Sequence, residues 1–356
     1  MTNSEQDDQG PLFGFRIVDL SQVLSGPAAT MLLADQGAEV IKVEPSHGDI
    51  TRNLGVGGDG MSTFDFNTNR GKRGISLDIK TPGGSEVVRR LIKTADVLVQ
   101  NFRPGVLEKL GFGFDAVRAI RDDIIYVSIN GFGTQGSYAA KRVYDPVVQA
   151  LSGLTEIQAE AGRPRMMRTV IPDKTTALTA AQAITVALLG RTRTRSARHV
   201  EIAMLDATIA YLWPEAMSNQ TVIDDTQEVQ FGQPIQELIF KTRDGYITTG
   251  AMSDKEWQSL CQALEKPEWI DDPRFKKTEL RFSNAQVVDN DIIQEYEHPG
   301  LGRVRQPRSA AKFRGLREAE KPLAPLLGQH NAEVLLELGY TQAEVDRFAD
   351  TDVISR

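Results

Sequence analysis

The stretch FRIVDLSQVLSGPAATMLLADQGAEVIKVE, residues 15–44, contains two short apolar segments separated by a helical pattern. FRIVDL and AEVIKVE have the length and the aliphatic content of strands, whereas AATMLLADQ has the length and composition of a helix. Pro27 suits the first turn of that helix, and Gly37 suits its end. A strand, a helix and a second strand in this order predict parallel pairing of the strands.

The same alternation continues toward the carboxyl end. Residues 74–79, 97–101 and 124–130 have the apolar pattern of strands, and residues 85–95 between the first two have that of a helix. We therefore expect an α/β fold with an open, mainly parallel, Rossmann-like sheet and helices on both faces.

The texture of the sequence also indicates how the chain is divided. Residues 1–12 are polar and acidic and predict a disordered head, and residues 13–220 predict one large α/β domain. Residues 221–300 begin a different pattern, with a hairpin signal in QELIFKTRDGYITTGA, and predict a small second domain. Residues 301–356 end in a pair of helices with a turn at Gly339, and we expect this segment to return to the large domain.

Composition excludes several classes of protein. The chain has 356 residues and a net charge of -7, so a surface for nucleic acid is not expected. No apolar run approaches the length of about 18 residues that a membrane helix needs, and the start has no export signal. The single cysteine, Cys261, cannot form an internal disulfide and lies in a helical pattern, where a buried thiol is expected. These features predict a cytoplasmic protein without a membrane partner.

Metal and dinucleotide sites are not indicated. The histidines are far apart in sequence and have no metal-binding spacing; they are His47, His199, His298 and His330. Glycines 55, 57 and 60 match the spacing of a dinucleotide loop, but GVGGDG does not directly follow a predicted strand and no helix is expected after it. We expect no metal and no permanently bound cofactor, and a flexible loop at these glycines.

Asp173 follows a proline and opens the helical pattern KTTALTAAQAITVALLG. One interpretation is an N-cap, whose carboxylate accepts a hydrogen bond from an amide of the first turn. The other is a nucleophile, because the positive end of the helix would keep the carboxylate ionised and able to attack an activated acyl group. The residues alone leave both interpretations open.

Basic residues gather in three places, at residues 69–73, 101–109 and 139–145. Such a cluster is usually a solvated face, but crevices at the strand ends of open parallel sheets often bind phosphorylated ligands. Arg103 and Lys109 are therefore candidates for contacts with phosphate.

A larger pattern is carried by ordered blocks spread over most of the chain. They are residues 16–52, 69–84, 95–112, 126–136, 144–154, the Asp173 helix, and residues 199–207, 231–234, 244–257 and 297–307. In these blocks the chain resembles family III CoA-transferases, the group of formyl-CoA transferase, carnitine CoA-transferase and alpha-methylacyl-CoA racemase.

The resemblance implies a role for particular residues. Asp173 falls at the position of the catalytic aspartate, with Tyr144 and Asp145 beside the reacting thioester and Gly232 and Gln233 at the end of a closing glycine loop. Leu24 falls in the same catalytic surroundings. The residues that fall at CoA-lining positions are Ser21, Gln22, Val23, Leu77, Asn101, Phe102, Arg103, Val106, Lys109 and Arg142. Backbone amides of residues 22–24 are candidates to stabilise an oxyanion.

Three departures from the family pattern bear on activity. Tyr144 stands where the racemase has a histidine that exchanges a proton, which favours transfer over racemisation. Leu24 stands where formyl-CoA transferase has glutamine, which disfavours formyl-CoA with oxalate. The chain passes almost directly from Asn284 to the block at His298, whereas other members of the family have several dozen more residues between these two points. The small domain is therefore abridged.

The resemblance thus implies an enzyme that transfers CoA between an acyl-CoA and a carboxylic acid acceptor. Asp173 would pass through an aspartyl mixed anhydride and an aspartyl-CoA thioester, and two subunits would form an intertwined homodimer. The alternatives are an acyl-CoA racemase or isomerase, and a non-catalytic CoA-binding paralogue. The sequence does not identify the acids.

Overall fold

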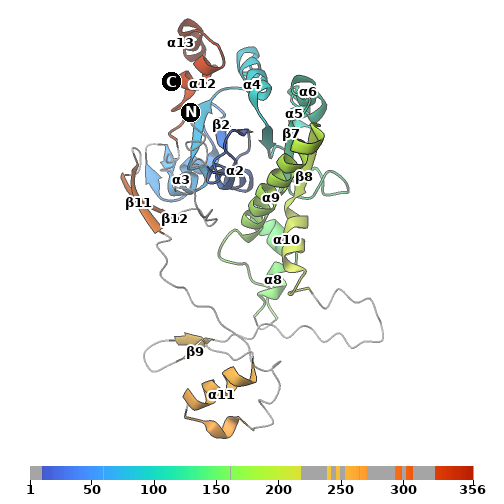
Figure 1. Ribbon diagram of the computed structural model, residues 1–356, viewed down its shortest axis with the longest axis vertical. Helices are drawn as coiled ribbons and strands as arrows, with labels where there is room; N and C mark the ends of the chain where they lie inside the picture. The colour runs from blue at the N-terminus through green and yellow to red at the C-terminus, as the bar shows by residue number, and fades with distance from the viewer. Residues whose placement is uncertain are drawn as a thin grey trace. The chain divides into compact units, whose positions relative to one another are not determined.

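The computed structural model divides into two compact units (Figure 1), one formed by residues 1–212 and 293–356 and the other by residues 213–292. The larger unit carries the sheet, and the smaller one corresponds to the region of changed sequence texture. The residues that the structure describes are 10–58, 60–160, 162–217, 239–241, 246–248, 253–263, 265–270, 293–298, 302–307 and 325–355.

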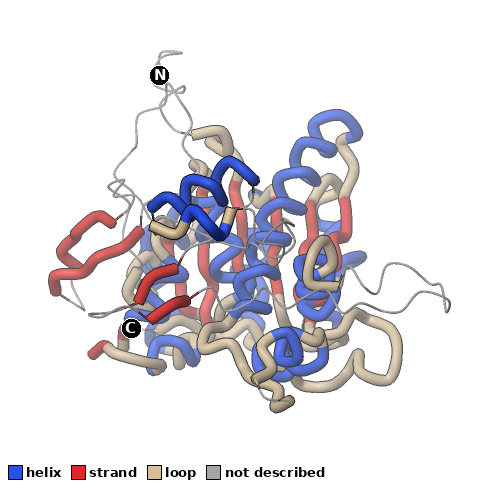
Figure 2. Tube along the Cα trace, turned by 90° about the horizontal axis from the view of Figure 1, so that it is seen from below, coloured by secondary structure: helices blue, strands red, loops and turns tan. Residues whose placement is uncertain are grey.

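The larger unit is built on a six-stranded parallel sheet in the order β5-β2-β1-β6-β7-β8, whose strands lie side by side in Figure 2. The strands are β1 (Arg16–Asp19), β2 (Glu39–Glu44), β5 (Lys72–Ser76), β6 (Val97–Gln100), β7 (Ile125–Asn130) and β8 (Arg198–Ala203). The first three strands of the sheet run outward from β1 to one edge, and the next three run from β6 to the other. This doubly wound order confirms the predicted α/β fold.

Helices cover both faces of the sheet, as predicted. On one face, α2 (Ser25–Ala34) and α9 (Ile171–Thr194) bury side chains such as Leu33 and Ile184 against Ile17 and Val99. The other face is covered by α4 (Pro82–Thr94), α5 (Val106–Lys109), α6 (Phe114–Ile120), α12 (Asn331–Glu337) and α13 (Gln342–Asp350). Strands buried on both sides must be apolar almost throughout, which explains the aliphatic runs in the sequence.

The edge strand β5 departs from the prediction for residues 74–79. It begins earlier, at Lys72, and ends at Ser76, after which Leu77 pairs with Ile354 in an antiparallel bridge. Lysine can occupy a buried strand here because its ammonium lies 3.0 Å from the carboxylate of Asp19. Beyond Ser76 the Leu77 N–H still donates to Glu44 O of β2 at 2.9 Å, while the open edge of the chain pairs with the carboxyl-terminal segment.

That carboxyl-terminal segment is tied to the edge strand by its own side chains. The Gly74 N–H donates to His330 Nδ1 at 2.9 Å, and the Ser76 N–H donates to Asn331 Oδ1 at 2.7 Å. These contacts satisfy edge groups that would otherwise be open to another strand. At the amino end, Leu12 is buried and its N–H donates to Gln36 O, so this residue belongs to the folded unit and not to a disordered head.

The larger unit also contains shorter elements. They are η1 (Ile50–Asn53), β3 (Gly57–Gly58), β4 (Met61–Ser62), α3 (Thr63–Asn69), α7 (Asp145–Leu151), α8 (Leu154–Ile157), α10 (Met204–Leu212), β11 (Ile293–His298) and β12 (Gly302–Pro307). The glycine-rich residues form the hairpin β3–β4, and a helix follows it, so the expectation of a loop without a helix was wrong. Ser62 caps that helix by accepting from the Asp65 N–H, which MSTFDFNTNR did not suggest.

The smaller unit contains the hairpin β9 (Ile239–Lys241) and β10 (Tyr246–Thr248), then α11 (Asp254–Ala263) and η3 (Pro267–Trp269). The hairpin confirms the signal in that part of the sequence. Cys261 is buried and packs beside Trp257, as expected. None of the described helices is long and apolar enough to cross a membrane.

Candidate functional site

The strand order reverses between β1 and β6, and the carboxyl ends of these two strands are where open α/β sheets bind ligands. Asn101, which directly follows β6, reaches across to the chain that leaves β1. Its Oδ1 accepts from the Gln22 N–H at 2.8 Å, and its Nδ2 donates to Gln22 O at 2.7 Å. The structure thus joins residues 21–24 and Asn101, two groups that the sequence assigned to one CoA site.

Residues 21–25 form a sharp turn from β1 into α2. Val23 has a φ of 68°, in the left-handed region that a β-branched residue rarely adopts. Leu24 follows as the buried N-cap of α2, and its side chain makes no capping bond. The turn brings Ser25, the first residue of α2, to face the start of α9.

Asp173 is the third residue of α9, and its carboxylate is not the cap of that helix. The N-cap position is Val170, without a capping side chain, so the capping interpretation was wrong. Instead, the Ser25 hydroxyl donates to Asp173 Oδ1. The carboxylate therefore lies between the amino ends of two helices that are packed together on one face of the sheet.

Asp145 supports Asp173 from the start of α7. It is buried, its Oδ2 accepts from the Asp173 N–H at 3.1 Å, and its Oδ1 accepts from Gln149 Nε2 at 2.6 Å. Gln149 Oε1 also accepts from the Met167 N–H at 2.9 Å, which fixes the chain that leads into α9. Tyr144, the residue before Asp145, is 65% exposed, so its ring is open to a ligand.

The electrostatics of Asp173 differ from the expectation that the helix end would hold it ionised. Burial raises the pKa of Asp173, the hydrogen bond from Ser25 lowers it, and the charge of Asp145 raises it further. Burial likewise raises the pKa of Asp145, against the lowering effect of Gln149. A desolvated carboxylate next to a second one is less stabilised as an anion, which favours attack on an electrophile.

Two of the predicted oxyanion donors are already engaged. The Gln22 N–H donates to Asn101, and the Val23 N–H donates to Asp49 Oδ2 at 3.0 Å. The expectation for these two amides was therefore wrong, since each has an intramolecular acceptor. Leu24 supplies the remaining amide of the three.

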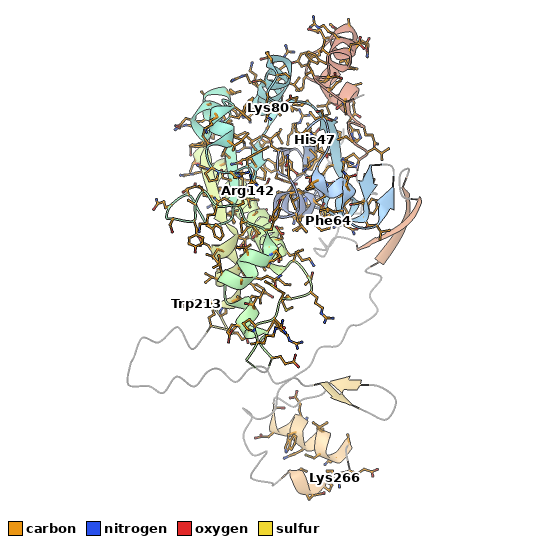
Figure 3. All side chains as sticks on the ribbon, turned by 180° about the vertical axis from the view of Figure 1, so that it is seen from behind. His47, Phe64, Lys80, Arg142, Trp213 and Lys266 are labelled. Carbon is orange, nitrogen blue, oxygen red and sulfur yellow. The ribbon has the colours of Figure 1, made fainter. Side chains whose placement is uncertain are left out.

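Three cations that the sequence proposed for phosphate are exposed. They are Arg103, which follows β6, Lys109 at the end of α5, and Arg142 on the loop between β7 and α7 (Figure 3). None of them forms an ion pair within the described part of the chain, so their charges are available to an anionic ligand. Phe102 packs against the core beside Arg103, and Val106 is exposed at the first position of α5.

The remaining predicted residues lie elsewhere. Leu77 is fully buried in the hydrophobic core, so it is not open to a ligand in this structure. Gly232 and Gln233 lie outside the described residues. No group of side chains that could hold a metal ion occurs in the part of the chain that the structure describes.

The basic cluster at residues 69–73 serves the fold. Lys72 is buried and donates to Asp19 Oδ2 at 3.0 Å, and burial lowers its pKa to about 8. Arg70 pairs with Asp35 at 2.6 Å. Arg73 pairs with Glu333 at 2.6 Å. These partners are distant in sequence, so the sequence did not show that the charges of this cluster are paired with acidic residues inside the fold.

Sequence reasoning also missed two members of the site, Ser25 and Gln149. Ser25 was assigned only to the start of a helix, and Gln149 had no signal of its own beyond its place four residues after Asp145. Ser25 acquires its role through Asp173, 148 positions away, whereas the partners of Gln149 are nearer, with Asp145 4 and Met167 18 positions away.

Comparisons with known proteins show which family the chain is similar to. The family model described as CoA-transferase family III matches residues 12–292. The succinyl-CoA:glutarate CoA-transferase of Mus musculus is 32% identical over 404 residues, which cover 99% of this chain and 92% of the mouse protein. The acetyl-CoA:oxalate CoA-transferase of Acetobacter aceti is 33% identical over 325 residues, 90% of this chain and 81% of that protein.

The fold is also similar to that of a solved structure. A CAIB/BAIF family protein from Brucella suis superposes with a TM-score of 0.77 at 27% identity, covering 93% of this chain and 100% of that chain. The alignment with the mouse protein spans 404 residues, whereas this chain has 356, so several dozen positions of the mouse protein have no counterpart here.

Proposed function

Because the chain belongs to CoA-transferase family III, we propose that it moves CoA between two carboxylic acids through covalent catalysis by Asp173. Transfer of CoA from an acyl-CoA to a carboxylic acid acceptor is the activity of the family, and CoA esters are its substrates. The observation that carries the proposal is the half-buried carboxylate of Asp173, which faces Ser25 beside the switch point of the sheet.

The proposed reaction is a series of acyl transfers between Asp173, the CoA thiolate and the two carboxylic acids. A carboxylate oxygen of Asp173 attacks the acyl carbonyl, the carbon–sulfur bond breaks, and CoA leaves as the thiolate. The thiolate then attacks the aspartyl carbonyl of the mixed anhydride, which releases the first acid as a carboxylate and leaves an aspartyl-CoA thioester. The acceptor carboxylate attacks the carbonyl of that thioester, the carbon–sulfur bond breaks, and a second mixed anhydride and free CoA thiolate form. The thiolate then attacks the acyl carbonyl of the acceptor, which gives the new acyl-CoA and releases Asp173 as a carboxylate.

The surroundings of Asp173 suit this sequence of steps. Each intermediate keeps the acyl group activated, so water must be excluded from the carboxylate. Ser25 can donate to the carboxylate in the resting enzyme and to the aspartyl oxygen when charge develops there. Arg103, Lys109 and Arg142 supply the positive charge for the phosphates of CoA.

The acids are best sought among those used by relatives. Succinyl-CoA with glutarate and acetyl-CoA with oxalate are the pairs named for two of them. A screen of these donors and acceptors for exchange of CoA should reveal the preferred pair. Solvent deuterium at the alpha carbon without an acceptor would indicate a racemase or isomerase instead. Tight CoA binding without turnover would indicate a non-catalytic paralogue.

The decisive variant is Asp173→Asn, which keeps the shape of the side chain. Turnover should fall by about 10⁴-fold or more, the scale observed when a covalent nucleophile is removed. The free energy of unfolding should not fall, because the substitution removes a desolvated carboxylate that lies near Asp145. Wild-type enzyme treated with its acyl-CoA and then hydroxylamine should carry a hydroxamate at Asp173, detected by peptide mass spectrometry. An unmodified Asp173 in an active preparation would refute covalent catalysis.

A homodimer, intertwined as in the family that the sequence resembles, is part of the same proposal. Apolar side chains stand exposed on two successive helices, with Leu178, Val186 and Leu189 on α9 and Tyr211 on α10. The two helices contact each other, and large exposed apolar side chains on neighbouring helices are typical of subunit interfaces. Light scattering at falling protein concentration should show a persistent dimer, and a monomer on dilution would contradict an interlocked pair.

A further inference from the structure

We propose that Asp49, together with Lys42, is a positioning residue that holds residues 21–25 in the conformation in which Ser25 meets Asp173. This inference rests on the proposed role of Asp173. Neither residue touches Asp173, and neither belongs to the site derived above. Their contribution would be made through the backbone of the turn between β1 and α2.

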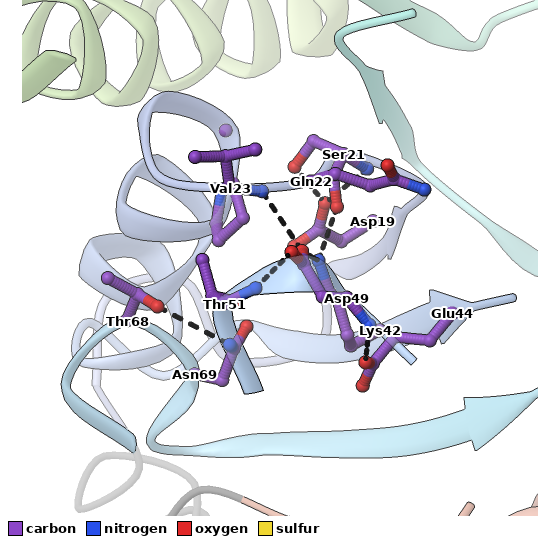
Figure 4. A network of polar contacts seen from close by, with 12 residues as sticks. Asp19, Ser21, Gln22, Val23, Lys42, Glu44, Asp49, Thr51, Thr68 and Asn69 are labelled. Carbon is purple, nitrogen blue, oxygen red and sulfur yellow. Dashed lines mark hydrogen bonds and ion pairs between the residues drawn. The ribbon is translucent and has the colours of Figure 1, made fainter. Parts of the chain in front are cut away.

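Asp49 lies beneath that turn and is almost fully buried. Its Oδ2 accepts from the Val23 N–H at 3.0 Å, and its Oδ1 accepts from the Thr51 N–H at 3.1 Å (Figure 4). Its own N–H donates to Glu44 Oε2 at 2.9 Å. One carboxylate thus joins the turn to η1, and η1 in turn is held to β2.

Lys42 completes the anchor from β2. Its side chain is completely buried, its ammonium lies 3.6 Å from Asp49 Oδ2, and it donates to the carbonyl oxygen of Ser21. Two consecutive parts of the turn are therefore bound to one buried ion pair: the carbonyl of Ser21 to the cation and the N–H of Val23 to the anion. A buried pair of this kind is costly to break from one side, which makes it a rigid support.

The support is needed because the turn is strained. Val23 is β-branched and has a φ of 68°, a conformation that persists only where the surroundings impose it. Without the bond to Asp49, Val23 would relax toward negative φ and change the direction in which α2 begins. Ser25 is two residues further along, so this relaxation would move its hydroxyl away from Asp173.

Asp49→Asn tests the anchor with little change in shape. An amide has only one acceptor oxygen, so either Val23 or Thr51 loses its acceptor, and one of the negative charges beside Lys42 is lost. We expect kcat/KM to fall roughly 10- to 100-fold, as expected when a catalytic group is misplaced by about 1 Å. Loss of the Ser25 hydrogen bond should also raise the pKa of Asp173, so the acidic limb of the pH profile should move to higher pH.

Asp65→Asn is the matched control. Asp65 is equally buried in the same network, where it accepts from Thr51 Oγ1 at 3.1 Å and from Asn69 Nδ2 at 2.9 Å. It makes no recorded bond to residues 21–25, so its substitution should leave the acidic limb in place. Asp145 on α7 is the charged side chain that faces Asp173, and it is unchanged in both variants.

A rescue separates anchoring from general damage to the fold. Glycine adopts a φ near 68° without strain, so Val23→Gly in the Asp49→Asn background should restore much of the lost rate and return the acidic limb toward its original position. This double variant also serves if Asp49→Asn alone does not fold. A double variant as impaired as the single one, or equal effects of Asp49→Asn and Asp65→Asn on the acidic limb, would overturn the proposal. Failure of covalent catalysis would show separately, as an active Asp173→Asn enzyme without a hydroxamate in the wild type.

Discussion

Gly26, the second residue of α2, is expected to be intolerant of a methyl group, although it lies in a helix where alanine is normally preferred. A β-carbon at this position would lie 2.2 Å from Ser21 Oγ and 2.3 Å from Ser21 Cβ. Ser21 cannot easily give way, because its side chain is buried and its hydroxyl donates to Asp19. Gly26→Ala must therefore displace either Ser21 or the start of α2.

The size of the effect follows from competing contributions. Replacing a helical glycine by alanine favours the helix by about 1 kcal/mol. Overpacking costs about 1 to 3 kcal/mol, and loss of the hydrogen bond from Ser21 to the carboxylate of Asp19 costs about 1.5 to 3 kcal/mol. The steric and polar costs win, and we expect a net loss of about 2 to 5 kcal/mol in the free energy of unfolding.

Gly190→Ala is the matched control, because Gly190 lies within α9 and a β-carbon there would have no neighbour within 4 Å. That variant should be stabilised by about 0.5 to 1 kcal/mol. Denaturant unfolding should be followed by far-ultraviolet circular dichroism, since the three tryptophans all lie in residues 213–292 and report on the smaller unit. Equal stabilisation by both alanines would refute the close approach of Gly26 and Ser21.

Two further predictions concern the ligand and the carboxyl-terminal segment. Lys109→Ala and Arg142→Ala should each weaken CoA binding roughly 10- to 100-fold, the equivalent of one charge-assisted contact; unchanged affinity in calorimetric titrations of both variants would remove them from the site. Burial lowers the pKa of His330 below 6.5, so this residue contributes stability that is present above pH 6.5 and is lost as the pH falls. His330→Gln should flatten this part of the dependence of the denaturation midpoint on pH between 7 and 5, and an identical slope in both proteins would contradict the assignment.

Local patterns accounted for most of the secondary structure of the larger unit. Strands buried on both faces need aliphatic runs, and helices need their own periodicity, so both are visible in a short window. The predicted bounds of a strand were wrong where residues distant in sequence determine its start and its end. β5 starts at Lys72 because Asp19 neutralises the ammonium, and beyond Ser76 the open edge of the chain pairs with the carboxyl-terminal segment.

In the candidate site, too, some features could be predicted from the sequence and others depended on distant residues. The resemblance pointed to Asp173, and the place of Asn101 at the end of a predicted strand agreed with a ligand at the sheet edge. The interpretation of Asp173 as a cap came from local sequence alone, and it failed because the structure places the hydroxyl of Ser25 against the carboxylate. A residue 148 positions away cannot be inferred from the periodicity of a single helix.

The sequence by itself thus determined the α/β class, the succession of elements and the family, because these depend on residue types and on the order of motifs. Only the tertiary structure decided which charged side chains are exposed and can bind a ligand, and which are buried in ion pairs within the fold. Lys72 and Lys109 look alike in the sequence, yet the first is buried against Asp19 and the second is exposed. The physical reason is that the state of a charge depends on its solvation and its neighbours, and both are set by parts of the chain that become adjacent only on folding.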